Sequence, residues 1–122
     1  MPAFNGNQNV LATMVLSGDT INLFANETLT NGEQSIVIAP ADAARPRTLI
    51  QWQAEYAGSA TTINIYGSNT YPTSSGPDPN GVLVGTLDNN PAGFSDNSGF
   101  AFYWAQAAAA NASGVTVSAH VR

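Results

Sequence analysis

Apolar and polar residues alternate with a period of two along much of the chain, which is the pattern of half-buried β-strands. The clearest case is segment 50–56, IQWQAEY, where Ile, Trp, Ala and Tyr alternate with Gln and Glu. A second alternating segment, TINIY at 62–66, follows a short connection that contains Gly58. Because this connection has hairpin length, we expect the two segments to fold back on each other as one ribbon.

Six further segments have the alternation or composition of short strands. They are VLATMVL (10–16), TINLFA (20–25), SIVIAP (35–40), VLVGTLD (82–88), FAFYWAQ (100–106) and VTVSAHV (115–121). Segment 100–106 is apolar on both faces, which is typical of a strand covered on two sides. Residues 68–81 and 89–99 are predicted as surface loops, and 41–46 and 107–112 each have room for one helical turn.

Together these segments predict an all-β fold. About eight short strands, spaced roughly 8 to 12 residues apart and without a long helix, are typical of a β-sandwich. We expect a single antiparallel, jelly-roll-like sandwich over residues 10–122. Residues 1–9, MPAFNGNQN, are polar and are predicted to form an N-terminal arm outside it.

Composition narrows the partners of the chain. Only 9% of its 122 residues are charged, the formal net charge is −5, and there is no lysine. A nucleic-acid interface needs a basic surface to neutralise phosphates, so nucleic acid is not expected as a partner. No apolar stretch approaches the ~20 residues that span a bilayer, so no membrane partner is expected. Low charge favours a protein that works within an assembly, because interface centres are depleted of charge.

Candidate catalytic groups are few. The single histidine, His120, falls on the polar side of its predicted strand, and the chain has no cysteine, lysine or phosphate-binding glycine motif. Asp78, Asp88 and Asp96 lie in or beside the two long loops, where carboxylates can bind Ca²⁺ or hydrogen-bond within turns. Their spacing selects no metal motif, so we favour the turns and expect no catalytic residue, metal or cofactor.

Three aromatic residues on or next to the loops are candidates for stacking on sugar rings. They are Tyr66, Tyr71 and Phe94. The other interpretation of these side chains is that they cap the ends of the hydrophobic core.

The second half of the chain resembles a known protein class. The run Ile65-Tyr66-Gly67-Ser68-Asn69 is followed by a loop, the strand VLVGTLD, the aromatic strand FAFYWAQ and VTVSAHV. Over residues 45–122 this resembles the small β-sandwich proteins of tailed bacteriophage particles, in which a GSN turn precedes an LGTL strand and an aromatic-arginine strand. Here Ala105 and Gln106 stand where an arginine often follows the aromatic residues, so no role of that arginine is carried over. Related sandwiches occur among carbohydrate-binding discoidin-like domains.

The resemblance implies a non-enzymatic component of a phage particle. We therefore expect a capsid decoration (cement) protein, made in the host cytoplasm and located in the virion, that binds the outer surface of the shell. Its expected partners are further copies of itself, as a homotrimer, and the major capsid protein or another virion protein. The alternative is a carbohydrate-binding β-sandwich module, virion-borne or secreted, that uses the loop aromatics.

Overall fold

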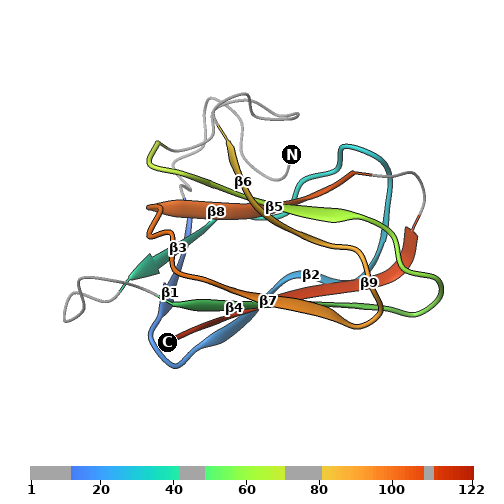
Figure 1. The fold of residues 1–122 in the computed structure, drawn as a ribbon, viewed down its shortest axis with the longest axis horizontal. Coiled ribbons are helices and arrows are strands. Elements are labelled where there is room, and N and C mark those ends of the chain that lie inside the picture. The colour runs from blue at the N-terminus through green and yellow to red at the C-terminus, as the bar shows by residue number, and fades with distance from the viewer. Residues whose placement is uncertain (1–11, 42–48, 71–80, 109–111) are drawn as a thin grey trace.

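The computed structural model describes residues 12–41, 49–70, 81–108 and 112–122 (Figure 1). Within these ranges the chain forms nine β-strands in two sheets and no helix, so they contain no helical membrane span. The strands are β1 (Thr13–Leu16), β2 (Thr20–Leu29), β3 (Ile38–Ala41), β4 (Ile50–Tyr56), β5 (Ile63–Ser68), β6 (Val82–Leu87), β7 (Ala92–Asp96), β8 (Phe102–Ala107) and β9 (Ala112–Val121).

The two sheets pack face to face as a β-sandwich, which confirms the predicted fold class. One sheet has the strand order β1-β3-β8-β5-β6 and the other β2-β9-β4-β7, and they form the upper and lower layers of Figure 1. Strands β2, β3, β4 and β5 pair antiparallel with β9, β8, β7 and β6 respectively. This pairing, like one long hairpin rolled up, is the connectivity of the eight-stranded jelly roll.

Strand β1 is an addition to the eight-stranded roll. It lies at the edge of the five-stranded sheet and pairs with β3 in parallel. Between β1 and β3 the chain passes through β2, which belongs to the other sheet. When it comes back to the five-stranded sheet, β3 runs in the same direction as β1. The predicted antiparallel sandwich therefore contains this one parallel pair among the described strands.

The predicted ribbon of 50–56 with 62–66 is wrong in its pairing. Strand β4 lies in the four-stranded sheet and β5 in the five-stranded sheet, so the connection between them crosses from one layer to the other. At the start of the connection, the amide of Ala57 donates to the carbonyl of Gly114 on β9, in the four-stranded sheet. At its end, the carbonyl of Thr62 accepts from the amide of Ala108, which follows β8 in the five-stranded sheet. Alternation identifies the buried face of a strand but not its neighbour, and β4 instead pairs with β7 and β9.

The side chains that alternation placed inward do form the core. Ile50, Trp52, Ala54 and Tyr56 of β4 are buried and the residues between them are exposed, as predicted. Across the sandwich the ring of Trp52 meets that of Tyr103 on β8, with centroids 5.8 Å apart. The core thus lies between the sheets and joins them through large aromatic side chains.

Several predicted element boundaries need correction. Residues 89–99 were predicted as a loop, but they contain the edge strand β7, whose short sequence AGFSD carries one large apolar residue and a glycine. The predicted helical turn at 107–112 is wrong at both ends, since Ala107 ends β8 and Ala112 begins β9. The predicted arm, residues 1–9, and most of the predicted turn at 41–46 lie outside the described residues.

Candidate functional site

Tyr66 lies on the outer face of the five-stranded sheet, the face turned away from the core. Its ring is half-buried and stacks on Trp104 of β8, with centroids 6.0 Å apart and planes 22° from parallel. Its hydroxyl accepts a hydrogen bond from Asn64 Nδ2 at 3.4 Å, and Asn64 Oδ1 accepts one from Thr86 at 2.9 Å. An aromatic ring beside amide and hydroxyl groups is chemically suited to a sugar, but more than half of this side chain is already covered.

Trp104 and Gln106 also point to the outer face, yet both are buried. Trp104 is 1% exposed, and a Cβ on Gly81 would meet its ring at 2.8 Å, so the backbone at Gly81 covers it. Gln106 accepts a long bond of 3.4 Å from the buried Gln34. Among the residues that the structure describes, Gln34 Oε1 and Trp104 Nε1 have no hydrogen-bond partner. Trp104, Gln106 and Gln34 thus pack as a second, smaller core, and the partly exposed ring of Tyr66 lies against it.

Phe94 lies at the open side of the sandwich between the edge strands β6 and β7. It is half-buried and packs against the core from β7, opposite Trp52 in the register with β4. Its ring rests on Gly85 of β6, where a Cβ would come within 2.7 Å of three ring carbons. This position favours the core-capping interpretation for Phe94, while Tyr71, the third aromatic candidate, lies outside the described residues.

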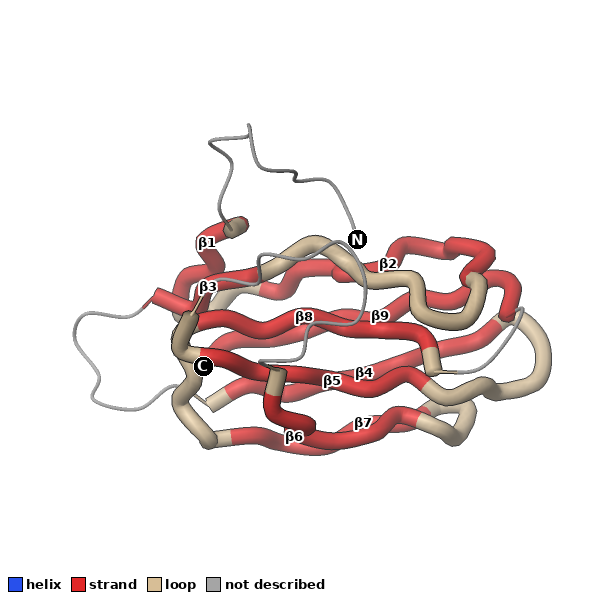
Figure 2. The backbone as a smooth tube through the Cα atoms, turned by 90° about the horizontal axis from the view of Figure 1, so that it is seen from above, coloured by secondary structure: helices blue, strands red, loops and turns tan. Residues whose placement is uncertain are grey.

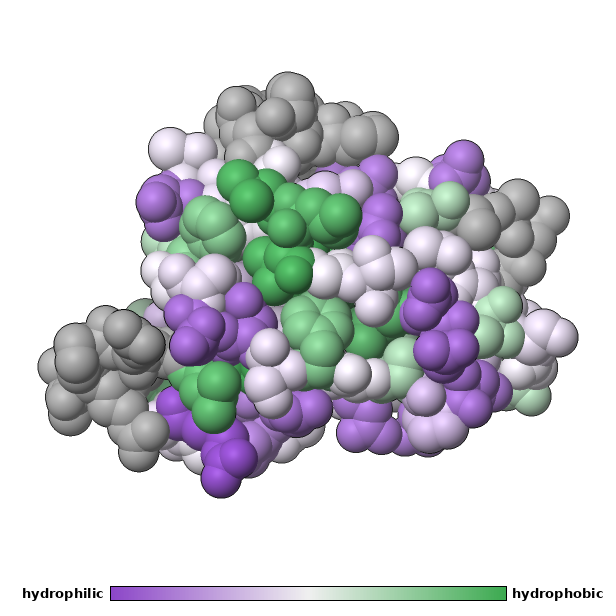
Figure 3. Space-filling model, viewed as in Figure 1, coloured by the Kyte–Doolittle hydropathy of each residue, from purple (hydrophilic) through white to green (hydrophobic). Residues whose placement is uncertain are grey.

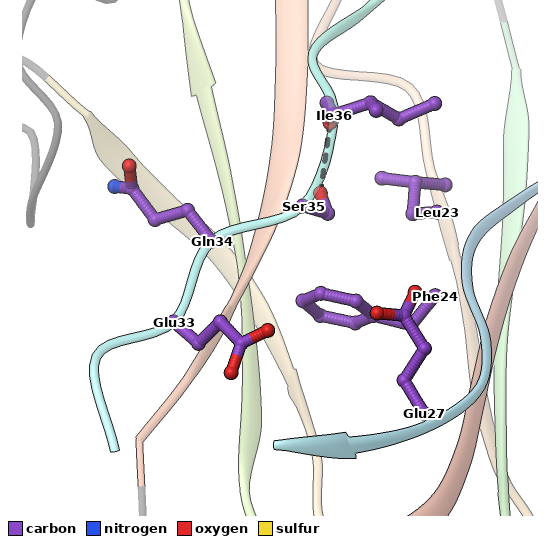
Figure 4. A pocket seen from close by; sticks show the side chains of 7 residues that line it. All are labelled: Leu23, Phe24, Glu27, Glu33, Gln34, Ser35 and Ile36. Atoms are coloured by element: carbon purple, nitrogen blue, oxygen red, sulfur yellow. Dashed lines mark hydrogen bonds between the residues drawn. The ribbon is translucent and has the colours of Figure 1, made fainter. Parts of the chain in front are cut away.

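A small pocket opens beside β2, between that strand and the segment before β3 (Figure 4). Its volume is about 210 Å³, below the ~300–1,000 Å³ of typical ligand sites. The side chains of Glu27 and Glu33 extend toward the ring of Phe24 at its base, while the Gln34 side chain points away (Figure 4). Both carboxylates already accept backbone amides, Glu27 from Ala25 and Glu33 from Thr30. The pocket is therefore a shallow acidic recess whose acids are engaged in local turns.

The acidic residues of the loops are engaged in similar ways. Asp96 accepts the backbone amide and the hydroxyl of Ser98, at 3.1 and 2.8 Å, which is the hydrogen-bonding pattern of an Asx turn. Asp88 is exposed, and Asp78 lies outside the described residues. Over the described ranges no three His, Cys, Asp or Glu side chains converge on one point.

His120 lies on the outer face of the four-stranded sheet, as its alternation predicted. Its Nδ1 is 2.7 Å from the hydroxyl of Thr20 on the neighbouring strand β2, and the ring is half-buried. A hydroxyl without a neighbouring carboxylate does not make imidazole a general base of the triad type. His120 therefore serves as a cross-strand polar contact.

Tyr56, at the end of β4, ties the two sheets together. Its hydroxyl donates to the carbonyl of Leu87 at the end of β6, at 2.7 Å. Burial, together with the nearby Asp88 carboxylate, raises the pKa of Tyr56 from 10 to about 12. A tyrosine with a raised pKa holds its proton as a structural donor and is not an acid or base near neutral pH.

The most unusual surface feature is apolar and lies at the two edges of the five-stranded sheet. On β1, Met14 is 67% and Leu16 52% exposed, and on β6, Val82 is 52% and Leu83 55% exposed. Figure 3 shows an apolar patch over the region where Figure 1 places β6. Figure 2 shows that β6 and β1 lie on opposite sides of the sandwich. A fifth exposed large side chain, Leu49, precedes β4.

These two edges also lack the usual protection of strand edges by charge. The sequences of β1 (TMVL) and β6 (VLVGTL) contain no charged residue. The edges of the four-stranded sheet each carry an acid, Glu27 on β2 and Asp96 on β7. Charged side chains on an edge strand keep it from pairing with another chain. The five-stranded sheet thus presents two unguarded edges, in the sense that neither edge strand carries a charge of its own and both expose apolar side chains. At the end of β1, the N–H of Leu16 donates to the Asp19 carboxylate and its C=O accepts from the Asp19 amide.

Sequence reasoning did not identify these edge residues as a candidate site. Segments 10–16 and 82–88 were recognised as strands, but which strands lie at an edge depends on long-range pairing. The usable signal was the absence of charge in 10–16 and 82–87, together with apolar residues at both odd and even positions of these segments.

No protein-family model matches this chain, and no curated protein shows significant sequence similarity to it.

Proposed function

We propose that this protein is a non-enzymatic structural component of a tailed-bacteriophage particle, a decoration protein that self-associates and binds the outer surface of the capsid. The observation that carries this proposal is the pair of uncharged, apolar edges on one sheet. Such edges make a free monomer prone to aggregate, whereas in an assembly they can pair with a neighbouring subunit. Jelly rolls are common among capsid proteins and lectins, which agrees with the resemblance over residues 45–122.

The proposed mechanism is stabilisation by linkage. A protein that binds the assembled shell, but not its separated subunits, adds its binding free energy to the stability of the shell. At a free concentration one hundred times the dissociation constant, that contribution is about 2.7 kcal/mol for each site. Many sites on one shell therefore make a large difference to its stability without any chemical step.

The test uses particles from the phage that encodes the chain, purified on a density gradient. The protein is expected in fixed ratio to the major capsid protein. Particles made without it should release their DNA at a lower temperature, and adding the purified protein back should restore the original value. Absence of the protein from purified particles, or particles equally stable with and without it, would overturn the proposal.

A second function, glycan binding, is favoured by the group around Tyr66 on the outer face. The partly exposed ring lies next to the amide of Asn64, which bonds the hydroxyl of Thr86, and both groups are suitable partners for sugar hydroxyls. Binding on a glycan array that is lost in Tyr66→Ala, but kept in the control Gln53→Ala on the other sheet, would support this function. No binding to any glycan of a broad array would exclude it.

A further inference from the structure

The two unguarded edges of the five-stranded sheet fit each other. We propose that β6 of one copy pairs with β1 of the next copy, so that the sheet continues from subunit to subunit and closes into a ring. This inference names the surfaces of the self-association that is part of the proposed function, and it rests on that function for its biological purpose. The surfaces themselves follow from strand direction, side-chain orientation and charge.

Strand direction favours this pairing. Strand β1 runs parallel to β3, β3 antiparallel to β8, β8 antiparallel to β5, and β5 antiparallel to β6. Strands β1 and β6 therefore run in opposite directions. When a second copy is placed beside the first with its sheet in the same orientation, β6 meets the neighbour's β1 as an antiparallel pair, the arrangement with the stronger hydrogen bonding.

Side-chain orientation favours it as well. Val15 is buried in the core, so Met14 and Leu16 on either side of it point to the outer face. Leu83 lies opposite Tyr66 in the pairing of β6 with β5, and Tyr66 is on the outer face too. In a continued sheet the exposed side chains of both edges lie on the same face and form cross-strand apolar contacts.

A second copy fits both edges better than an unrelated partner does. Each edge offers a short strand without charged residues, and the complement of such an edge is another strand edge. On β1 the N–H and C=O of Leu16 already bond Asp19, so the new pairing would use the part of β1 before Leu16. Pairing of β6 with β6 about a twofold axis would satisfy that edge only and leave Met14 and Leu16 exposed. Pairing of β6 with β1 satisfies both edges in every subunit.

The size of the contact explains why a ring is expected. Strand β1 has four residues and β6 has six, so one junction is small against the ~1,000 Å² that a stable interface buries. A head-to-tail contact that closes gives every subunit two junctions, and removing one subunit then breaks both. Closure thereby makes two weak contacts act together, because the second forms within the same assembly.

The test uses cysteine variants, which are unambiguous because the chain has no cysteine. Met14→Cys and Leu83→Cys replace exposed side chains, so both variants should fold. The two are co-expressed with tags of different size, purified together and treated with a bifunctional maleimide that reaches neighbouring and diagonal positions, about 8 Å apart. The control combines Met14→Cys with Gln53→Cys, an exposed position on the central strand β4 of the other sheet.

The proposal predicts a cross-linked product that contains one copy of each tag. Either cysteine variant alone should give no product above the control. The Met14→Cys/Leu83→Cys double variant should give a covalent series that stops at the ring. Equal cross-linking of Leu83→Cys with itself would show same-edge pairing and overturn the proposal, as would a mixed product no stronger than the control.

This experiment is independent of any phage particle. Cross-linked rings that neither occur in particles nor stabilise them would overturn the proposed function and leave the head-to-tail pairing in place. If the protein stabilises particles but cross-links only through identical positions, the proposed function would stand and the head-to-tail pairing would be overturned. The two failures are therefore distinguishable.

Discussion

The contact of Phe94 with Gly85 closes the open side of the sandwich, and replacing Gly85 by alanine tests it. The ring of Phe94 on β7 lies against the backbone of Gly85 on β6, and a Cβ there would come within 2.7 Å of three ring carbons. In Gly85→Ala, the ring must move toward solvent or β6 must move away from the core. Overpacking of this kind costs about 1–3 kcal/mol.

A double-mutant cycle isolates the contact from other effects of the methyl group. Alanine in a strand is favoured over glycine by about 0.5–1 kcal/mol, so this gain should appear once the ring is removed in Phe94→Ala. Phe94→Ala itself should cost about 2 kcal/mol, roughly half the value for a fully buried ring. The expected interaction free energy between the two substitutions is therefore about 1.5–4 kcal/mol.

The assay is unfolding in urea, monitored by the fluorescence of the buried Trp52 and Trp104. The unfolding free energies of the four proteins of the cycle are compared with one common value for their dependence on urea concentration. Gly58→Ala is the matched control, because a Cβ at Gly58 meets nothing within 4 Å. An interaction free energy below about 0.5 kcal/mol would refute the reasoning. The ring of Phe94 would then be free of Gly85, and its prediction as a sugar-stacking residue would gain support.

Three further predictions concern pH, a loop and an edge. The pKa of Tyr56 is 10 in the unfolded chain and about 12 in the folded protein, so the stabilisation that Tyr56 contributes is complete below pH 10 and is lost between pH 10 and 12. The loss of unfolding free energy is at most about 2.7 kcal/mol, and less where water screens the group, and Tyr56→Phe should flatten this part of a plot of stability against pH. The side-chain amide of Asn90 bonds both the backbone N–H and the backbone C=O of Tyr56, at 3.2 and 2.8 Å. In urea titrations, Asn90→Ala should therefore lower the unfolding free energy by about 1–3 kcal/mol, whereas Asn89→Ala, at an exposed position, should change it by less than about 0.5 kcal/mol. Leu83→Arg should lower the mass in size-exclusion chromatography with light scattering to that of a monomer while the circular dichroism stays unchanged, and Gln53→Arg should leave the mass as it was; an unchanged mass in Leu83→Arg would count against the β6 contact.

The sequence was sufficient for the fold class and for the inward faces of the strands. The alternation in 50–56 identified four buried side chains, and VTVSAHV did the same for the last strand, because a period of two directly reflects which face meets the core. It could not identify strand neighbours. The connection after Tyr56 has the length of a hairpin loop, but it passes from one sheet to the other because β4 pairs with β7 and β9 and not with β5.

The candidate sites were harder to predict because they depend on tertiary position. Strand β7 was missed because AGFSD has one large apolar side chain and gains its stability from pairing with β4. Tyr66 was predicted on or next to a loop and lies within β5, and its stacking on a buried Trp104 depends on the neighbouring strand β8. The exposure of Met14 and Leu83 follows from the position of their strands at the two ends of one sheet, which no local pattern encodes.

The molar mass of the purified wild-type protein in solution tests the central claim, that the chain functions by self-association, most directly. We would measure it by light scattering over a range of concentrations. The account predicts a constant multiple of 12.6 kDa, about 38 kDa for a three-membered ring. A mass of 12.6 kDa at every concentration would contradict self-association, and a mass that rises without limit would contradict closure into a ring.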